Sequence, residues 1–380
     1  MESIHVTARQ QGDRRIVSSD AFEVFFELPQ ADPTTDTFAL WLALPIAMRL
    51  GRPLRIDGAV PRLALENARR LSAIWGMWRP DLFSEVPVTA RDEIEVAPKA
   101  RTCRAIMAFS GGIDSTSALL DLCAAGGPRP DLVTVHGMDY RRDDCDRFDR
   151  LLARTEPFRA ACAGELLVAR SDAASVMRRF GIAPEVGFSF QLAATCFLME
   201  NRYDTAYVAA DFADFQEVMV GPYSTGSAVA RLFRHEGMGF HLLGLDKTRS
   251  EKVAQIAADP RALRSLSFCK DYDTRPENCG LCSKCVRSKA MFHAALGEVP
   301  DIFLSRDFHP RDLERLDLSR RFEQIFARDI LSLARRTGHE DEFAALAARL
   351  EAPAPVQGAR YYLYKLKIMR DARRARRARA

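Results

Sequence analysis

The chain has 380 residues, so a single small module is excluded and about two or three domains are expected. Hydrophobic residues make up 47% and charged residues 28% of the chain, which is typical of a globular protein with a sizeable core and excludes wholesale disorder. The net charge is +4, but residues 360–380 hold nine cations and one acid, so the rest of the chain carries −4 and shows no general preference for polyanions.

Residues 1–98 are expected to form an α+β accessory domain. The elements expected there are a strand at 22–28, a helix at 40–48, a strand at 54–56 and a helix whose first residue is Pro61. Trp75 and Trp78 recur at helical spacing on the apolar stripe of the last helix. They could line a ligand pocket, but this position favours the core.

From Ala105 the pattern changes to short continuous apolar runs separated by amphipathic segments. The runs predict strands at 105–109, 132–136, 166–169, 205–210 and 240–243, with helices such as 115–124 and 148–163 between them. Unbroken buried strands that alternate with helices are typical of a parallel, doubly wound α/β sheet. Ligands bind such sheets at the carboxyl ends of the strands, which is where we expect the chemistry.

Beyond Phe292 the pattern is mostly helical, with helices expected at 312–334 and 341–350. The alternating alanines and prolines of Ala352–Pro355 are typical of a linker. The expected organisation is an accessory domain at 1–98, an α/β domain at 99–295, a helical C-terminal region at 296–358 and a basic tail at 359–380.

A phosphate-binding loop is predicted directly after the strand at 105–109. The segment Phe109–Thr116 combines Gly111 and Gly112, which let the backbone turn tightly, with serine and threonine hydroxyls, and a helix follows it. The unpaired N–H groups at a helix N-terminus attract anions. The segment lacks the motifs of a Walker loop, a dinucleotide site and a serine-hydrolase elbow. An ordinary strand-to-helix turn is the alternative.

The run Ser110-Gly111-Gly112-Ile113-Asp114-Ser115 resembles the pyrophosphate loop of the ATP pyrophosphatases, whose fold is adenine nucleotide alpha-hydrolase-like and which cleave ATP between the α and β phosphates. The resemblance implies that Ser110, Asp114 and Ser115 act in catalysis, with Asp114 as the magnesium-side carboxylate or the loop organiser. It implies a site for ATP and Mg²⁺ made of Ala108, Phe109, Ser110, Gly111, Gly112, Ile113, Asp114, Ser115, Thr116, Asp139 and Tyr140. The last two residues end the next strand, where the family places residues near the adenine and the substrate.

Four clustered cysteines predict a metal site. Cys269 precedes Cys279, Cys282 and Cys285, and the last three have Cys-x-x-Cys spacing. We expect neither a transmembrane segment nor a secretion signal, so the cysteines face a reducing cytoplasm, where metal binding is favoured over disulfides. Four thiolates from one loop suit a structural Zn²⁺ site with no open position, and an iron–sulfur cluster is the alternative.

The loop and the cysteines together, over residues 103–295, resemble the 7-cyano-7-deazaguanine synthases. The segment Cys279-Gly280-Leu281-Cys282-Ser283-Lys284-Cys285 has the order of that family's cysteine block, and Asp246–Lys247 resembles its Asp-Lys segment. Lys247 would stabilise charge on the phosphates, as a lysine does in adenylate-forming sites. A surface lysine at a helix start is the alternative.

The sequence also departs from those synthases. Gly187–Phe190 stands where the family carries an Arg-Asn pair, Arg287 is displaced by one position from an arginine after the last cysteine, and the segment 212–227 does not match the substrate loop. These departures leave ATP and zinc untouched and indicate a different acceptor.

The resemblance implies an ATP-dependent, AMP-forming ligase. A carboxylate or amide oxygen of a small-molecule or peptide acceptor would attack the α phosphate, and a nitrogen nucleophile would then displace AMP. The sequence shows no glutaminase domain, so ammonia would come free or from a partner. The alternatives are a tRNA thiolase or base-modifying enzyme, and a non-enzymatic ATP-binding interaction protein.

The partners of the chain are less constrained than its cofactors. The tail at 360–380 could bind RNA or an acidic membrane surface, but a solvated helix is favoured. A homodimer stays an open alternative.

Overall fold

The computed structural model describes residues 2–96 and 104–352, together with 359, 362, 363 and 366. The predicted boundary at residue 98, the linker beyond Ala352 and almost all of the basic tail lie outside these residues. The chain divides into two compact units. The first comprises Met1–Ser110, Asp114–Asp211 and Pro222–Leu245, and the second comprises Gly111–Ile113, Phe212–Gly221 and Asp246–Ala380.

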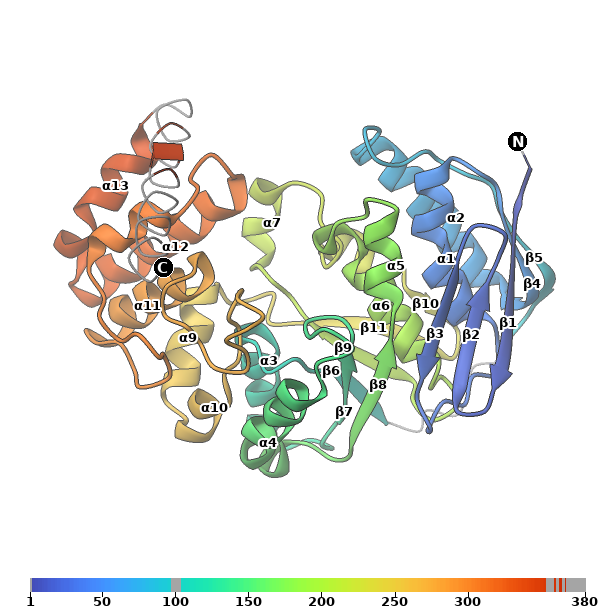
Figure 1. Cartoon of the computed structure of the whole chain (residues 1–380), viewed down its shortest axis with the longest axis horizontal. Coiled ribbons are helices and arrows are strands. Elements are labelled where there is room, and N and C mark those ends of the chain that lie inside the picture. Colours follow the sequence, from blue (N-terminus) through green and yellow to red (C-terminus); the bar gives the residue numbers. More distant parts are fainter. Residues whose placement is uncertain (1, 97–103, 353–358, 360–361, 364–365, 367–380) are drawn as a thin grey trace, which may run out of the picture. The chain divides into compact units, whose positions relative to one another are not determined.

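A large sheet dominates the first unit (Figure 1). Among the described residues, eleven strands form it in the order β10-β11-β9-β6-β7-β8-β3-β2-β1-β4-β5. The strands are β1 Ile4–Gln11, β2 Arg14–Ser18, β3 Glu23–Glu27, β4 Leu54–Pro61, β5 Val88–Ile94, β6 Ala105–Ala108, β7 Asp131–His136, β8 Leu166–Ser171, β9 Thr205–Ala209, β10 Arg234–His235 and β11 Met238–Leu243. The fold is therefore α/β with a mixed, mostly parallel sheet.

The neighbouring strands β11, β9, β6, β7 and β8 are parallel to one another. They confirm the strands predicted from the apolar runs between residues 105 and 243. The chain runs outward from β6 through β7 to β8, and then returns to form β9 and β11 on the other side of β6. The direction in which strands are added thus reverses between β6 and β9.

The N-terminal strands extend the same sheet. β3 confirms the strand predicted at 22–28 and pairs with β8 through Phe26↔Ser171 and Glu27↔Arg170. The apolar pattern does not predict β1, β2 or β5, because few of their side chains are buried. Whether residues 1–98 are a domain of their own stays a prediction.

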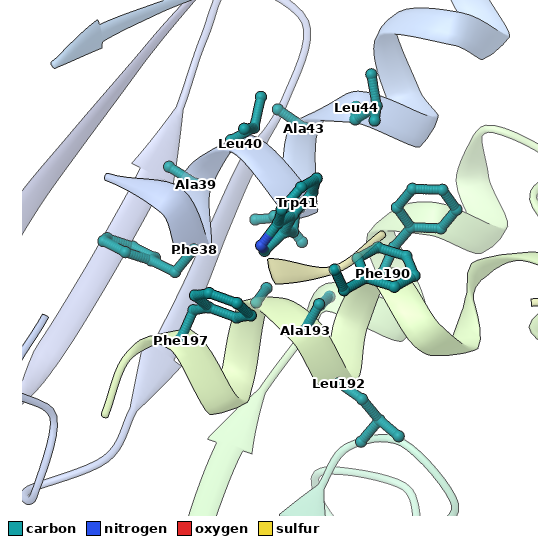
Figure 2. Packing of buried hydrophobic residues seen from close by; sticks show 14 of the residues in the cluster. Phe38, Ala39, Leu40, Trp41, Ala43, Leu44, Phe190, Leu192, Ala193 and Phe197 are labelled. Carbon is teal, nitrogen blue, oxygen red and sulfur yellow. The ribbon is translucent and has the colours of Figure 1, made fainter. Parts of the chain in front are cut away.

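Helices pack on this sheet and enclose the core of the first unit. They are α1 Thr37–Leu50, α2 Arg62–Trp78, α3 Ile113–Ala124, α4 Cys145–Cys162, α5 Ala173–Arg179, α6 Pro184–Phe197 and α8 Ser227–Ala230. Figure 2 shows the indole of Trp41 pointing from α1 toward α6, and its ring lies edge-on to those of Phe197 and Phe233 at centroid distances of 6.1 and 5.2 Å. Trp75 is fully buried and Trp78 packs against the same cluster, which confirms that both belong to the core.

One predicted helix start is wrong by a residue. Pro61 ends β4 and is the N-cap of α2, with an extended ψ of 138°, so the first helical residue is Arg62. The strand predicted at 54–56 is likewise longer, because β4 continues past a bulge between Ile56 and Ala59.

Helices dominate the second unit. They are α7 Asp214–Val220, α9 Arg249–Ala257, α10 Pro260–Ser265, α11 Ser283–Leu296, η1 Pro310–Arg315, α12 Arg321–Thr337, η2 Glu340–Phe343 and α13 Ala344–Glu351, where η marks a 3-10 helix. Within the residues that the structure describes, no helix is both long enough and apolar enough to span a membrane.

The single helix predicted at 312–334 is wrong. The chain leaves the helical conformation at Leu316, whose ψ is 132°, and Asp317 accepts a hydrogen bond from the Ser319 N–H at 3.2 Å. A local side-chain acceptor of this kind competes with helical hydrogen bonding, and α12 begins only afterwards. The helix predicted at 341–350 is confirmed as α13, preceded by the 3-10 turn η2.

Candidate functional site: a phosphate loop and a cysteine cluster

The segment after β6 has the strand–loop–helix arrangement that the sequence predicts. β6 ends at Ala108, the Phe109 N–H donates to the Val133 carbonyl of β7 at 2.9 Å, and α3 begins at Ile113. Gly111 has a φ of +72°, a conformation that L side chains rarely adopt. The loop therefore turns sharply at the carboxyl end of β6, beside the point where the strand order reverses.

Hydroxyl groups gather at the start of α3. The Ser110 and Ser115 Oγ atoms are 3.4 Å apart, and the Ser110 N–H lies 3.4 Å from the Ser115 Oγ. Thr116 is fully buried, and its Oγ1 has no hydrogen-bond partner among the described residues. Asp114 is the acidic residue of the first helical turn. A buried hydroxyl of this kind at the N-terminus of a helix suits an anionic ligand.

Asp139 and Tyr140 follow β7 in a turn that packing holds in place. Gly137 has a φ of +110°, and a Cβ there would lie 1.9 Å from the Ser171 carbonyl oxygen. The Tyr140 ring is buried against Phe148, at a centroid distance of 5.9 Å, and Asp139 is partly exposed. Of the two residues, Asp139 is thus the more accessible to a ligand.

His136 is the last residue of β7, and its side chain supports the turn through two contacts. It stacks on Phe148 with ring centroids 4.2 Å apart, and its Nε2 lies 2.9 Å from the Arg141 carbonyl oxygen. Burial lowers the pKa of His136. The neutral ring therefore donates through Nε2 and serves as part of the scaffold.

The four cysteines Cys269, Cys279, Cys282 and Cys285 lie together in the second unit, and their Sγ atoms are all within 4.8 Å of one another. The Cys269–Cys282 and Cys279–Cys285 sulfur distances are 3.9 and 3.8 Å. A tetrahedron with Zn–S bonds of ~2.3 Å has edges of ~3.8 Å, so the cluster could hold one zinc ion. A cluster of several iron and sulfide ions would need more widely separated ligands.

Hydrogen bonds favour the thiolate form at two of these sulfurs, those of Cys279 and Cys282. The Leu281 and Cys282 N–H groups each lie 3.3 Å from the Cys279 Sγ. Hydrogen bonding within the cluster, with Cys269 the largest contributor, lowers the pKa of the Cys279 thiol to about 6 and also lowers that of Cys282. Hydrogen bonds from the other cysteines raise the pKa of Cys269 and Cys285. Thiolates are the form that binds metal, so Cys279 and Cys282 are the two sulfurs that already favour the ligating state.

Asn278 and Gly280, where the sequence predicts tight turns, shape the cysteine loop. Gly280 has a φ of +76°, and a Cβ there would lie 2.1 Å from the Ser305 carbonyl oxygen. Asn278 is fully buried, and its amide donates to the Leu266 and Ile302 carbonyls at 3.0 and 3.2 Å while accepting from the Phe268 N–H at 3.0 Å. A polar residue beside a ligand cysteine is common in loops, so the sequence held no specific sign of these bonds.

Lys247 and Arg287 are the remaining residues that the sequence singled out. Lys247 precedes α9, and its Nζ lies 3.5 Å from the Gln255 Oε1. Arg287 is buried and pairs with Glu323 of α12 at 2.9 Å, so its charge serves helix packing. The described contacts thus unite the four cysteines, and Ser110 with Ser115.

The segments that depart from the synthase pattern contact one another in the first unit. The Ser189 Oγ of α6 donates to the Ser224 carbonyl at 2.7 Å, and the Thr225 Oγ1 donates to the Asp211 Oδ2 at 2.6 Å. Asp211 follows β9 at the reversal of strand order. Its sign in the sequence is a charged residue directly after a buried strand.

Comparison of the chain with models of known families, with curated proteins and with solved structures finds no match. The loop, the cysteine cluster and the sheet that carries the loop are therefore the features that point to a function.

Proposed function

We propose that the protein is an ATP-dependent, AMP-forming ligase of the ATP pyrophosphatase type, related to the 7-cyano-7-deazaguanine synthases but with a different acceptor. The observation that carries the proposal is the Ser110–Ser115 loop, which leads from β6 into the first residues of α3. In doubly wound sheets, ligands bind at the carboxyl ends of the strands where the strand order reverses. The order β8-β7-β6-β9-β11 places this loop at such a point.

The groups around the loop fit a polyphosphate. The N-terminus of α3, a helix of 12 residues, offers N–H donors and a positive partial charge. Ser110 and Ser115 add hydroxyl donors, and Thr116 adds a buried hydroxyl with no described partner. A negatively charged pyrophosphate would satisfy these donors better than water, which supports ATP as the ligand.

The proposed reaction proceeds in two displacements. An oxygen of the acceptor attacks the α phosphorus, the bond between that phosphorus and the oxygen bridging to the β phosphorus breaks, and pyrophosphate leaves into the loop. A nitrogen nucleophile then attacks the activated carbon, AMP leaves with the acceptor oxygen, and the nitrogen loses a proton. Mg²⁺ would neutralise charge on the phosphates when bound. Asp114 would hold it from the first turn of α3, and Lys247 would contribute a second positive charge.

Zinc would have a structural role. Four thiolates fill a tetrahedral site and leave no position for substrate. The cysteine loop would thus be held in shape by the metal, and the chemistry would stay with the residues of the phosphate loop.

The proposal is tested by the position at which ATP is cleaved. Full-length protein with Mg²⁺, ammonium and fractionated small-molecule or peptide extracts should form AMP and pyrophosphate in at least one fraction. Asp114→Ala and Ser110→Ala should abolish AMP formation while the variants remain folded, whereas Asp121→Ala, in the same helix, should keep it. ADP and inorganic phosphate as the only products, or full turnover by Asp114→Ala, would refute the loop assignment.

A tRNA thiolase is the second candidate, and one observation keeps it open. Such an enzyme needs an accessible cysteine outside the metal site to carry a persulfide, and Cys145 is exposed at the start of α4. Cys196, by contrast, is buried, and burial raises its pKa to about 12. A protein with all five outer cysteines replaced by serine that retains its activity would exclude the thiolase.

A further inference from the structure

A short path of hydrogen bonds links the cysteine cluster to Gly111, and all the residues of this path belong to the second unit. The path starts at Asn278, which directly precedes the ligand Cys279. The Asn278 amide contacts the Leu266 carbonyl and the Phe268 N–H, both at 3.0 Å. It therefore clamps the segment 266–268 from both sides.

The clamped segment reaches the loop. The Ser267 N–H donates to the Gly111 carbonyl at 2.8 Å, and Gly111 is the loop residue with the left-handed backbone. Ser267 is 7% exposed, so water does not compete effectively for this bond. The orientation of the Gly111 peptide is thus fixed by the segment that Asn278 holds.

Both ends of the clamp lie next to metal ligands. Cys269 directly follows Phe268, and Cys279 directly follows Asn278. A metal ion bound to both sulfurs would draw the two backbones together and hold the Asn278 bonds closed. Without the metal, no ion connects the two sulfurs, and the hydrogen bonds of the Asn278 amide alone align the segment 266–268.

We propose that Asn278 is a positioning residue that couples metal binding at the cysteine cluster to the conformation of the phosphate loop. The coupling rests on the proposed function in one respect, since it takes the loop as the nucleotide site. Binding free energies are linked reciprocally, so a nucleotide that favours the ordered loop must tighten zinc binding by the same factor by which zinc tightens nucleotide binding.

The first test measures this linkage in the full-length wild-type protein. Zinc affinity is determined by competition with a chelating dye, with and without α,β-methylene-ATP in excess Mg²⁺. We expect the bound analogue to raise the zinc affinity by at least about 5-fold. An unchanged zinc affinity in protein that demonstrably binds the analogue overturns the proposal without any variant.

The second test assigns the coupling to Asn278. Asn278→Ala should lose most of the increase in zinc affinity. Asn67→Ala removes another buried asparagine, whose amide donates to the Arg234 carbonyl at 3.2 Å in the first unit, and should keep the full increase. If folded Asn278→Ala shows the same increase in zinc affinity as the wild type, Asn278 does not carry the coupling.

A third measurement separates this inference from the proposed function. Hydrogen exchange of the amides in 110–113 is compared between zinc-loaded wild type and zinc-loaded Asn278→Ala, with no nucleotide present. Faster exchange in the variant supports the positioning role even if the wild type binds no analogue, in which case only the function fails. Unchanged exchange overturns the positioning role whatever the protein binds.

Discussion

At the scale of single residues, the cysteine loop depends on a position that only glycine can occupy. Gly280 has a φ of +76°. A Cβ at this position would lie 2.1 Å from the Ser305 carbonyl oxygen. Both the backbone conformation and the space exclude a side chain. The Cys-Gly-x-Cys order is therefore a requirement of geometry as well as a resemblance.

Gly280→Ala should destabilise the protein by about 2–5 kcal/mol, because a strained backbone conformation and an overpacked contact add together. It should also lower zinc retention. Gly338→Ala is the matched control, since Gly338 has a φ of +81° but no atom within 4 Å of a built Cβ, so the cost should be about 1–2 kcal/mol. Urea unfolding and zinc analysis measure both effects, and equal losses in the two variants would contradict the steric argument.

Asp329 provides a pH-dependent test in the same unit. It is buried on α12 and accepts a hydrogen bond from the Ser250 N–H of α9 at 2.8 Å. Burial raises the pKa of its carboxyl above 3.8, against opposing hydrogen bonds from Thr248 and Ser250. The unfolded chain therefore releases this proton at a lower pH than the folded protein does, so stability falls as the pH rises from 3.8 through the raised folded-state pKa.

Asp329→Asn should lack this loss of stability. The difference in unfolding free energy between the variant and the wild type should move in favour of the variant over that pH range and then become constant. Urea unfolding at a series of pH values measures the difference. A difference that does not vary with pH would show that the ionisation of Asp329 does not contribute.

Single residues also show where the sequence was informative and where it was not. The cysteine spacing predicted a cluster that the structure brings together, because ligands close in sequence need only a local turn. The bonds of Asn278 could not be predicted, because Leu266 and Ile302 are brought to it by the fold of the whole unit.

At the scale of elements, α12 organises the second unit. Its Glu323 pairs with Arg287 of α11, its Asp329 bonds the start of α9, and its Phe326 stacks on Phe212 with ring centroids 5.0 Å apart. One helix thus contacts the helix that carries Cys285, the helix that follows Lys247 and the segment that precedes α7.

Glu323→Gln should cost about 3–5 kcal/mol, since it leaves the Arg287 guanidinium buried without a compensating charge. Glu340→Gln breaks the exposed Arg335–Glu340 pair, which should cost about 0–1 kcal/mol. Denaturant unfolding of the two variants measures the contrast. A small loss in Glu323→Gln would mean that the carboxylate does not stabilise the buried arginine.

Elements were predictable where one physical pattern dominated. The buried parallel strands β6, β7, β8, β9 and β11 are continuous apolar runs, and each was found close to its true bounds. The exposed strands β1, β2 and β5 were missed because sheet pairing, and not apolar patterning, defines them. The break between η1 and α12 was missed because a turn at Asp317 interrupts an otherwise helical pattern.

At the scale of the whole molecule, the chain crosses between two units several times. The sequence suggested divisions at residues 98 and 295, which follow composition along the chain. The compact units follow contacts in space, so short segments such as Gly111–Ile113 belong to a unit formed mostly by the C-terminal part of the chain. A partition based on the linear sequence cannot capture this arrangement.

Removal of the metal should affect the two units differently. All three tryptophans, Trp41, Trp75 and Trp78, lie in the first unit, so tryptophan fluorescence reports on that unit alone. Chelation should lower the helical circular dichroism signal and the temperature at which it is lost, because a structural metal contributes folding free energy. The tryptophan emission should change little, and a joint loss of both signals would contradict a metal role confined to the second unit.

The central claim is that the Ser110–Ser115 loop binds the phosphates of ATP, and a calorimetric titration tests it without knowledge of the acceptor. Mg²⁺–ATP is titrated into zinc-loaded wild type, Ser110→Ala, Asp114→Ala and the control Asp121→Ala. We expect the wild type and the control to bind with equal affinity, and both loop variants to bind at least about tenfold more weakly, a loss of ~1.4 kcal/mol each. Equal affinity in all four proteins, or no binding by the wild type, would contradict the account.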